Sequence, residues 1–387
     1  MPLDFSSLQD QVDTFAENEK AFHHLLGEQL TQALQALIRF SSNVAEMRAG
    51  GEKESKRIAL PFRENPNLTF PPHPIQTDYN LVCADGSQIT PDPHDAPLFA
   101  LLNVGIVRMS NKNTVVTPTT ISQLYQHHEL YLDNELIGED ILNLDRDVLE
   151  MRFLSEYSRD LQGTTVALRD GLLELYHEPR SEKAYRERFV RYHGYLKDMQ
   201  EDSIITAGYV DKPRSQMLVD LLRVCCAQKS KDQATSSFFP DVIDRQLFEQ
   251  ILKAGERSAI LENRAATNDT QIDPEKMPSY FFYLNVSQNE KAWIVRVEIP
   301  QWVAEDEEKV GLLQQVLLEQ CAIMGNKPYP YYLHRAHETA LVRQSEKEEL
   351  KKQIQSALVR KGVSLEEKSY KQSAKDQPTH KKVERRR

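Results

Sequence analysis

Several features that define common protein classes are missing from the sequence. No stretch reaches the roughly 18 to 20 apolar residues that a membrane-spanning helix needs, and the best candidate, residues 98–109, is short and contains Asn103. The N-terminal residues MPLDFSSLQDQ lack the basic-then-apolar order of a signal peptide. We therefore expect a cytoplasmic protein with no membrane association.

Cysteine is scarce, and its spacing argues against a zinc ribbon. The four cysteines are Cys83, Cys225, Cys226 and Cys321. No two of them form the C-x-x-C pair from which such a site is built. We expect buried, reduced thiols, as in most cytosolic proteins.

The motifs of four enzyme classes are also absent. The sequence has no G-x-x-x-x-G-K-[ST], no H-E-x-x-H and no G-x-S-x-G, and no G-x-G-x-x-G follows a strand-like run. These absences argue against a P-loop NTPase, a zinc protease, an α/β-hydrolase and a Rossmann dehydrogenase.

The charge balance is acidic, with a net charge of -10 at pH 7. Such a balance argues against a surface coated for nonspecific nucleic-acid binding. The tail from Lys371 onward has seven basic and two acidic residues, a net +5, so the rest of the chain carries -15. A nuclease remains compatible with this charge, because its catalytic carboxylates are themselves negative and are neutralised by metal.

The chain divides into four segments. Residues 1–50 predict an amphipathic helical arm, since apolar residues recur at spacings of three and four until Gly50 and Gly51. This arm either packs on its own domain or serves a second subunit. Residues 51–78 are charged and proline-rich, which predicts a linker. Residues 346–387 predict a charged helical end and a disordered basic tail.

The remaining segment, residues 79–345, mixes strands with helices. The early strand-like runs suggest hairpins, and helical stretches lie between the later ones. This order predicts an α/β or α+β domain around a mixed sheet. The strand-like runs are residues 80–84, 98–109, 114–120, 164–168, 203–210, 280–286 and 292–299.

Two apolar strands each end in an aspartate followed by glycine, at Asp85 and at Asp170. Two such carboxylates converge only if their strands lie close together in the sheet. Asp-Gly is also common turn chemistry, but two occurrences after apolar strands favour a site. A helix between them carries Glu150 and Glu156, either of which offers a third oxygen ligand. Mg²⁺ and Mn²⁺ prefer such carboxylates, and clustered acids imply a bound cation.

Residues 181–197 interleave arginine and lysine with tyrosine and phenylalanine. This mixture suits single-stranded nucleic acid, through phosphate pairing and base stacking. An amphipathic helix that buries its aromatic residues and exposes its charges gives the same pattern. We favour this second interpretation.

Taken together, six segments in a fixed order resemble the NurA family of DNA-repair nucleases, over about residues 79–345. Each segment is short and unspecific by itself, whereas their order and spacing are fairly specific. The segments are Val82-Cys83-Ala84-Asp85-Gly86-Ser87, Met151-Arg152-Phe153-Leu154-Ser155-Glu156, Asp170-Gly171-Leu172, Gly208-Tyr209-Val210-Asp211-Lys212-Pro213-Arg214-Ser215, Gly255-Glu256-Arg257-Ser258, and Tyr329-Pro330 with Ala336-His337.

The resemblance implies an α/β fold with an RNase H-like mixed sheet flanked by helices, here with an N-terminal helical extension. It implies a manganese or magnesium site, a homodimer, and a HerA-type hexameric ATPase as partner in repair of double-strand breaks. The implied activity is 5′-to-3′ exonuclease on DNA and endonuclease on single strands.

Carried onto this sequence, the resemblance makes Asp85, Glu156 and Asp170 the metal carboxylates. His337 becomes the late active-site histidine, which we also count as a metal ligand, and Tyr329 becomes the matching tyrosine. Independently of the resemblance, three cations are candidates for gripping the DNA backbone, since phosphate contacts position a strand without reading its sequence. They are Lys212, Arg214 and Arg257.

Two departures from the family pattern leave alternatives open. Arg169 stands where the family usually has an apolar residue, so it either crowds the metal or faces away from it. Glu150 lies near Glu156, which we prefer because Arg152 precedes it by one turn. A non-catalytic adaptor of a DNA-translocating ATPase and an RNA-directed nuclease are the alternative functions.

Overall fold

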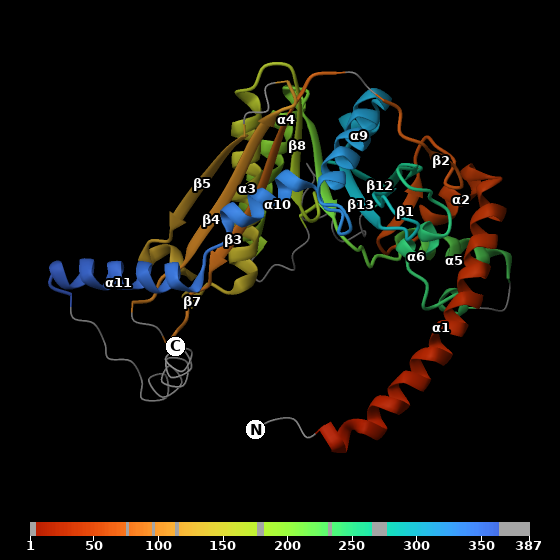
Figure 1. Ribbon diagram of the computed structural model, residues 1–387, viewed down its shortest axis with the longest axis horizontal. Coiled ribbons are helices and arrows are strands. Elements are labelled where there is room, and N and C mark those ends of the chain that lie inside the picture. The colour runs from red at the N-terminus through yellow and green to blue at the C-terminus, as the bar shows by residue number, and fades with distance from the viewer. Residues whose placement is uncertain are drawn as a thin grey trace. The chain divides into compact units, whose positions relative to one another are not determined.

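The computed structural model describes residues 5–74, 77–94, 97–112, 116–175, 182–230, 234–264 and 277–363. The chain forms two compact units, whose elements are labelled in Figure 1. Unit 1 comprises Met1–Thr77, Asp170–Glu174 and Ser203–Tyr331. Unit 2 comprises Asp78–Arg169, Leu175–Asp202 and Tyr332–Arg387.

Unit 1 contains an antiparallel set of strands. They are β1 (Ile58–Pro61), β2 (Thr69–Phe70), β9 (Ile205–Val210), β10 (Arg257–Ser258), β11 (Leu261–Arg264), β12 (Ser279–Asn285) and β13 (Ile294–Pro300). The order is β1-β11-β12-β13-β9, and β10 pairs with both β12 and β2. Two of these strands fall within residues 51–78, so the predicted linker is wrong there. Buried Ile58 and Leu60 explain why, because they place β1 in the core beside β11.

Four helices of unit 1, α1, α2, α5 and α6, pack apolar residues into one core. Buried residues from the second half of α1, from α2, and from α5 meet those of β1, β11 and β12 there. The helices are α1 (Phe5–Ser41), α2 (Val44–Gly51), α5 (Met217–Lys229), α6 (Asp244–Glu249), α8 (Gln301–Ala304) and α9 (Glu307–Ile323), with a short 3-10 turn at Thr235–Ser237.

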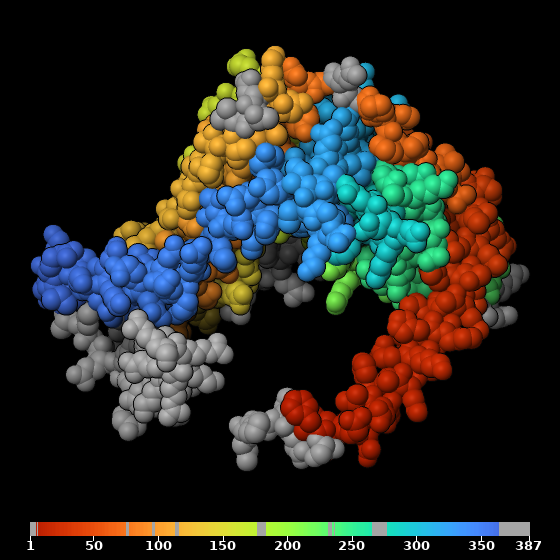
Figure 2. Space-filling view, in the orientation of Figure 1, coloured from red at the N-terminus to blue at the C-terminus, as the bar shows by residue number. Residues whose placement is uncertain are grey.

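Helix α1 has two halves with different surroundings. Ala33 and Leu37 are fully buried in the core, whereas Val12 and Phe15 are 56% and 65% exposed. In Figures 1 and 2 the first half extends away from α2, α5 and α6 and stands free on the face shown. Only the second half of the predicted arm therefore packs on its own domain.

Unit 2 is built around a mixed sheet. Its strands are β3 (Tyr79–Ile89), β4 (Leu101–Ser110), β5 (Val116–Leu124) and β8 (Thr164–Asp170). The order is β8-β3-β4-β5, in which β3, β4 and β5 are antiparallel neighbours and β8 runs parallel to β3. The α/β class and the mixed sheet flanked by helices are confirmed, and this arrangement agrees with the expected RNase H-like core.

Helices cover both faces of the unit 2 strands (Figure 1). They are α3 (Glu139–Arg159), α4 (Glu182–Glu201), α10 (Tyr331–Ala340) and α11 (Gln344–Arg360). A 3-10 turn (His127–Leu130) and the small hairpin of β6 (Tyr131–Leu132) and β7 (Glu135–Leu136) precede α3. In α11, Leu350 and Ile354 pack against Ile89 and its neighbours. The predicted basic tail from Lys371 lies outside the described residues.

Two glycines let these helices approach the sheet. Side chains alternate along a strand, so Ala84 and Gly86 point to one face and Asp85 to the other. A Cβ atom on Gly86 would lie 2.5 Å from the Glu150 carboxylate of α3. A Cβ atom on Gly105, which pairs with Asp85, would lie 2.3 Å from the Ala336 carbonyl of α10. Helix α3 thus covers the Gly86 face and α10 covers the Asp85 face.

The structure also bears on three expectations from the sequence, those for residues 181–197, for the cysteines and for membrane spans. Tyr185, Phe189 and Tyr192 of α4 are buried, which supports the amphipathic-helix interpretation of residues 181–197. The four cysteines are free thiols, three of them buried and Cys226 partly exposed. Among the described helices, none is long and apolar enough to span a bilayer.

The two halves of α1 predict unequal responses to truncation of an apolar side chain. Leu37→Ala leaves a cavity in the core, so we expect the free energy of unfolding to fall by about 2–5 kcal/mol. Phe15→Ala, on the same helix, is expected to change it by no more than about 0.5 kcal/mol. Urea denaturation followed by circular dichroism measures both values. Equal losses would contradict the division of α1.

Candidate active site

Asp85 lies in the middle of β3 and contacts α10. One carboxylate oxygen, Oδ1, accepts a hydrogen bond of 2.8 Å from the Gly86 backbone N–H. The other, Oδ2, lies 2.7 Å from Nδ1 of His337. The His337 side chain is 55% exposed, whereas that of Asp85 is 11% exposed. The structure thus joins two predicted residues that are far apart in the sequence.

The end of α10 is fixed on the sheet by hydrogen bonds. Asn103 on β4 donates to the Ala340 carbonyl at 2.6 Å, and the Ser87 hydroxyl donates to the same oxygen. Together with the close approach at Gly105, these contacts set where His337 stands. The Asp85-Gly86-Ser87 motif therefore supplies both an acid and an anchor for the helix that carries its partner.

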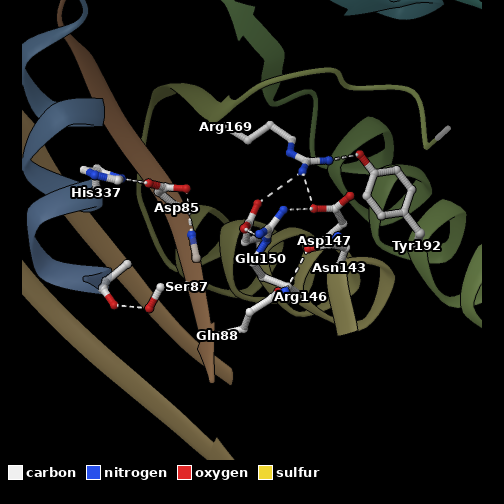
Figure 3. A network of polar contacts seen from close by, with 12 residues as sticks. Asp85, Ser87, Gln88, Asn143, Arg146, Asp147, Glu150, Arg169, Tyr192 and His337 are labelled. Carbon is white, nitrogen blue, oxygen red and sulfur yellow. Dashed lines mark hydrogen bonds and ion pairs between the residues drawn. The ribbon is translucent and has the colours of Figure 1, made fainter. Parts of the chain in front are cut away.

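A second cluster of charged side chains lies on the α3 face (Figure 3). Arg169 of β8 is 4% exposed. Its Nη2 lies 3.1 Å from Glu150 Oε2 and 3.1 Å from Asp147 Oδ1, and its Nη1 donates to the Tyr192 hydroxyl at 2.9 Å. Arg146 approaches the other Glu150 oxygen, with its Nε at 3.3 Å. We call these five residues the Arg169 network.

The register of β3 and β8 explains where Arg169 points. The two strands are parallel, and Ala84 pairs with Arg169, so both side chains face α3. Asp85 faces α10, on the other side of the sheet. Of the two alternatives for Arg169, the structure supports the one in which it faces away from Asp85.

Burial controls the electrostatics of the Arg169 network. Burial raises the pKa of Glu150 to about 8, against the opposing effect of Arg169, and the charges of Asp147 and Asp85 raise it further. Burial lowers the pKa of Arg169, but Tyr192, Asp147 and Glu150 outweigh this effect and hold it well above its ordinary value. Arg169 is therefore a fixed cation, and Glu150 is the α3 acid that feels the charge of Asp85.

Glu156 is not brought to this cluster. It lies six residues after Glu150, which rotates it by about 240° around the helix. Its side chain is 46% exposed and pairs with Arg152 at 2.8 Å. The structure therefore places Glu150, and not Glu156, on the buried face of α3 next to Gly86, while the identity of the third acid stays a prediction.

Asp170 and Tyr329 lie together in unit 1. The Tyr329 hydroxyl donates a hydrogen bond of 2.8 Å to Asp170 Oδ1, and the Tyr329 ring packs edge-on against Tyr209 at 5.3 Å between centroids. The turn after Asp170 requires glycine, since Gly171 has a φ of +86°. These contacts orient the Asp170 carboxylate.

The parallel ladder of β3 and β8 ends at the pair Ala84 and Arg169. In the sequence each of these residues is followed by an aspartate, Asp85 on β3 and Asp170 at the end of β8. That the two carboxylates share a cation stays a prediction.

The three predicted DNA-binding cations have different surroundings. Arg257 is 7% exposed, donates to both oxygens of Glu64 at 2.9 and 2.7 Å, and lies 4.1 Å above the Phe70 ring. Arg257 therefore holds β10 in place through a buried ion pair, unlike the other two cations. Lys212 and Arg214 are exposed, and the Lys212 ammonium lies 4.7 Å from the Trp293 ring.

The family model of the NurA domain matches residues 80–342, more than half of the chain. The chain belongs to the NurA family. No curated protein matches the sequence.

Nineteen chains of solved structures match as well. A crystal structure of NurA with manganese is 10% identical, with a TM-score of 0.39, and the match covers 72% of this chain and 89% of that chain. A crystal structure of NurA is 10% identical, with a TM-score of 0.38 and coverage of 84% and 97%. A crystal structure of NurA bound to dAMP and manganese is 10% identical, with a TM-score of 0.33 and coverage of 71% and 87%.

Helical periodicity, which can be read from the sequence, would have placed Glu150 on the buried face of α3. Residues that recur every three or four positions share one face of a helix. Asp147, Glu150 and Leu154 follow this spacing on the buried side of α3, and Glu156 does not. The prediction of Glu156 rests on its spacing from Arg152, and in the structure these two residues form an exposed ion pair.

The raised pKa of Glu150 predicts a pH-dependent stability. The pKa of a glutamate in an unfolded chain is about 4.3, and the pKa of Glu150 in the folded protein is about 8. Between these values the folded protein holds a proton that the unfolded chain has released, so stability falls as the pH rises through this window. Glu150→Gln removes the titrating carboxyl group, and with it this fall in stability. Relative to wild type, the variant should therefore gain stability between about pH 5 and about pH 8.

Urea denaturation in a chelating buffer at both pH values measures this difference. Glu156→Gln is the matched control, since it neutralises an exposed glutamate on the same helix, and its difference from wild type should stay nearly constant. A Glu150→Gln difference that is equally flat would contradict the buried, raised-pKa state of Glu150.

Proposed function

We propose that the chain is a divalent-metal-dependent nuclease that hydrolyses DNA phosphodiester bonds at a site centred on Asp85. The observation that carries this proposal is the placement of Asp85. It is largely buried on β3, it pairs with His337, and it directly follows Ala84, which pairs with Arg169 at the end of the β3–β8 ladder.

The donor atoms fit a divalent ion that prefers oxygen. Asp85, Glu150 and Asp170 offer carboxylates and His337 offers an imidazole, a set that suits Mn²⁺ or Mg²⁺. Within the described ranges, no three His, Cys, Asp or Glu side chains already form a group that could hold a metal. Each Asp85 oxygen still has a lone pair besides the one that its present contact uses. Manganese occurs in two of the solved NurA structures, so it is the first metal to test.

The bound ion would supply a water of lowered pKa and polarise the scissile phosphate. The residues of the chain do the rest. Asp85 holds Nδ1 of His337, which orients the ring and leaves Nε2 to ligate the ion, hold the phosphate or protonate the leaving oxygen. Tyr329 orients the carboxylate of Asp170. Lys212 and Arg214 are exposed and suit contacts to the DNA backbone.

The acids of the site predict a sharp pattern of activity loss. Asp85→Asn, Asp170→Asn and Glu150→Gln should each lower metal-dependent cutting by at least about 100-fold, because removal even of an outer partner of a metal site commonly costs 10- to 100-fold. Glu156→Gln should keep wild-type activity. Isothermal titration with Mn²⁺ gives a second readout, in which the first three variants bind the ion more weakly.

End-labelled single-stranded DNA, with Mn²⁺, Mg²⁺ or chelator, is the substrate for this test, and RNA of the same sequence is run in parallel. Preferential cleavage of RNA would replace the DNA nuclease with an RNA-directed one. If cleavage is absent even with the partner ATPase present, the chain is an adaptor. Activity lost in Glu156→Gln but kept in Glu150→Gln would reverse our assignment of the third acid.

We also propose that the free half of α1 serves assembly, either in a homodimer or on a HerA-type ATPase that acts with the nuclease on DNA ends. Exposed apolar residues recur there along one stretch of helix, and a few hundred Å² of contiguous apolar surface usually marks an interaction site. The residues are Phe5, Val12, Phe15, Phe22 and Leu25.

Charged substitutions test this role more cleanly than deletion of residues 1–50, which would remove Leu37 from the core. We expect the double variant Val12→Glu and Phe15→Glu to weaken self-association or ATPase binding by at least about tenfold, because it places charge on an apolar contact. Gln11→Glu, at an exposed polar position of the same helix, is the control. Light scattering and co-purification measure the outcome. Unchanged subunit stoichiometry and unchanged ATPase binding would remove the proposal.

A further inference from the structure

Unit 2 has a cavity of about 360 Å³ that the proposed cutting site does not use. Helices α3 and α4, strands β4 and β5, and the segment around β6 line it. We call it the α3–α4 pocket. Its polar lining is dominated by arginine and tyrosine, and the residues that matter here are Tyr125, Asp145, Arg152, Arg188, Arg191 and Tyr195.

One part of the pocket lining is an arginine and a carboxylate that neutralise each other. Arg188 donates to both oxygens of Asp145, from Nε at 2.6 Å and from Nη2 at 2.8 Å. The Tyr125 hydroxyl donates to the same carboxylate at 2.9 Å. Bidentate pairs of this kind hold a rigid geometry. The charge of Asp145 is therefore already satisfied and does not repel an anion.

The mouth of the pocket carries cations that are free to bind. Arg191 is exposed, and among the described residues no acidic side chain pairs with it. Arg152 pairs with Glu156, but both side chains are 46% exposed, and such surface pairs contribute little. Three arginines, Arg152, Arg188 and Arg191, line the pocket against two acids, Asp145 and Glu129, so it carries a small excess of positive charge in a protein that is acidic overall.

Aromatic rings stand beside these cations. Tyr195 follows Arg191 by four residues, so the two side chains lie on the same face of α4, and Tyr195 is partly exposed. Tyr131, 42% exposed, lines the opposite wall. A cation for the phosphate and an aromatic face for the base are the two components of single-strand recognition.

We propose that the α3–α4 pocket binds one nucleotide of single-stranded DNA, with its phosphate at Arg191 and its base against Tyr195. The volume lies at the lower end of the range for small-ligand sites, which suits one nucleotide. A duplex fits poorly, because its bases are stacked and offer no free face. The identity of the polymer as DNA rests on the proposed function.

Helix α3 links the pocket to the proposed cutting site. Asp145, Leu149 and Arg152 line the pocket, whereas Asp147 and Glu150 face Arg169. Leu149 and Glu150 are consecutive residues of this helix. The pocket and the proposed third acid are therefore on neighbouring residues of one helix. The basic and aromatic residues of 181–197 thus include a buried set and a set that lines this pocket, while Arg186 is exposed and belongs to neither.

Helix α4 offers a matched pair of variants. Arg191→Glu and Arg186→Glu make the same charge change at exposed positions of one helix, but only Arg191 lines the pocket. Fluorescence anisotropy with labelled oligothymidine, on the full-length protein in chelator, measures binding without cutting. We expect Arg191→Glu to weaken binding by about tenfold or more and Arg186→Glu to leave it within about twofold.

Tyr195→Ala tests the stacking component separately. Loss of one stacked base typically costs about 5- to 150-fold in affinity, so we expect at least about fivefold weaker binding with an unchanged dependence on salt. Arg191→Glu should instead reduce the dependence of log affinity on log salt concentration, because fewer counterions are released. Duplex DNA of the same length should bind more weakly and should not respond to Tyr195→Ala. Melting temperatures check that the variants fold.

The outcomes separate this proposal from the nuclease proposal. If Arg191→Glu and Tyr195→Ala weaken binding but wild type never cuts DNA, the pocket stands and the nuclease proposal fails. If wild type cuts DNA but Arg191→Glu binds as tightly as Arg186→Glu, the pocket proposal is overturned. It is also overturned if wild type does not bind oligothymidine, or if duplex and single strand bind equally and Tyr195→Ala has no effect.

Discussion

The parallel pairing of β3 with β8, with Ala84 opposite Arg169, is the constraint on which the other features of the site depend. Because side chains alternate along strands, this register decides which residues meet α3 and which meet α10. A shift of β8 by one residue along β3 would turn Arg169 toward the Asp85 face. The glycines at 86 and 105 fit only the observed register, since α3 and α10 leave no room for a Cβ atom there.

The same register explains how the protein keeps so many charges inside unit 2. A buried acid without a partner costs several kcal/mol, and like charges placed together raise that cost. Arg169 reduces it for Asp147 and Glu150 together, and the Tyr192 hydroxyl completes its hydrogen bonding. The arginine that departs from the family pattern is thus an internal counter-ion for the acids of α3. Its side chain lies on the face of the sheet opposite Asp85, whereas its partner Glu150 is close enough for the charge of Asp85 to raise the Glu150 pKa.

What the sequence predicted and what it missed differ in a physical way. Asp85, His337, Tyr329 and Asp170 sit in short motifs whose local chemistry is visible in the sequence, and the structure gives each of them a polar partner. The predictions for Glu156 and Arg257 rest on the family pattern and on charge, and neither residue's surroundings could be read from the sequence: Glu156 is exposed and Arg257 is buried. Arg257 finds Glu64 across 193 positions of the chain. The strand at Ile58–Pro61 is likewise defined by pairing with β11. Such long-range partners have no local signature.

The acidic character of the chain sets how DNA is to be held. A net charge of -10 repels a polyanion at long range, although salt screens this repulsion beyond about 10 Å at 0.1 M ionic strength. In the functions that we propose, binding would come from short-range contacts that outweigh it: a divalent ion among the carboxylates, exposed cations such as Lys212 and Arg214, and the tyrosines and arginines between α3 and α4. Stacking on tyrosine is not weakened by salt as phosphate contacts are. A protein of this charge therefore gains most from aromatic contacts, and these favour single strands over duplexes.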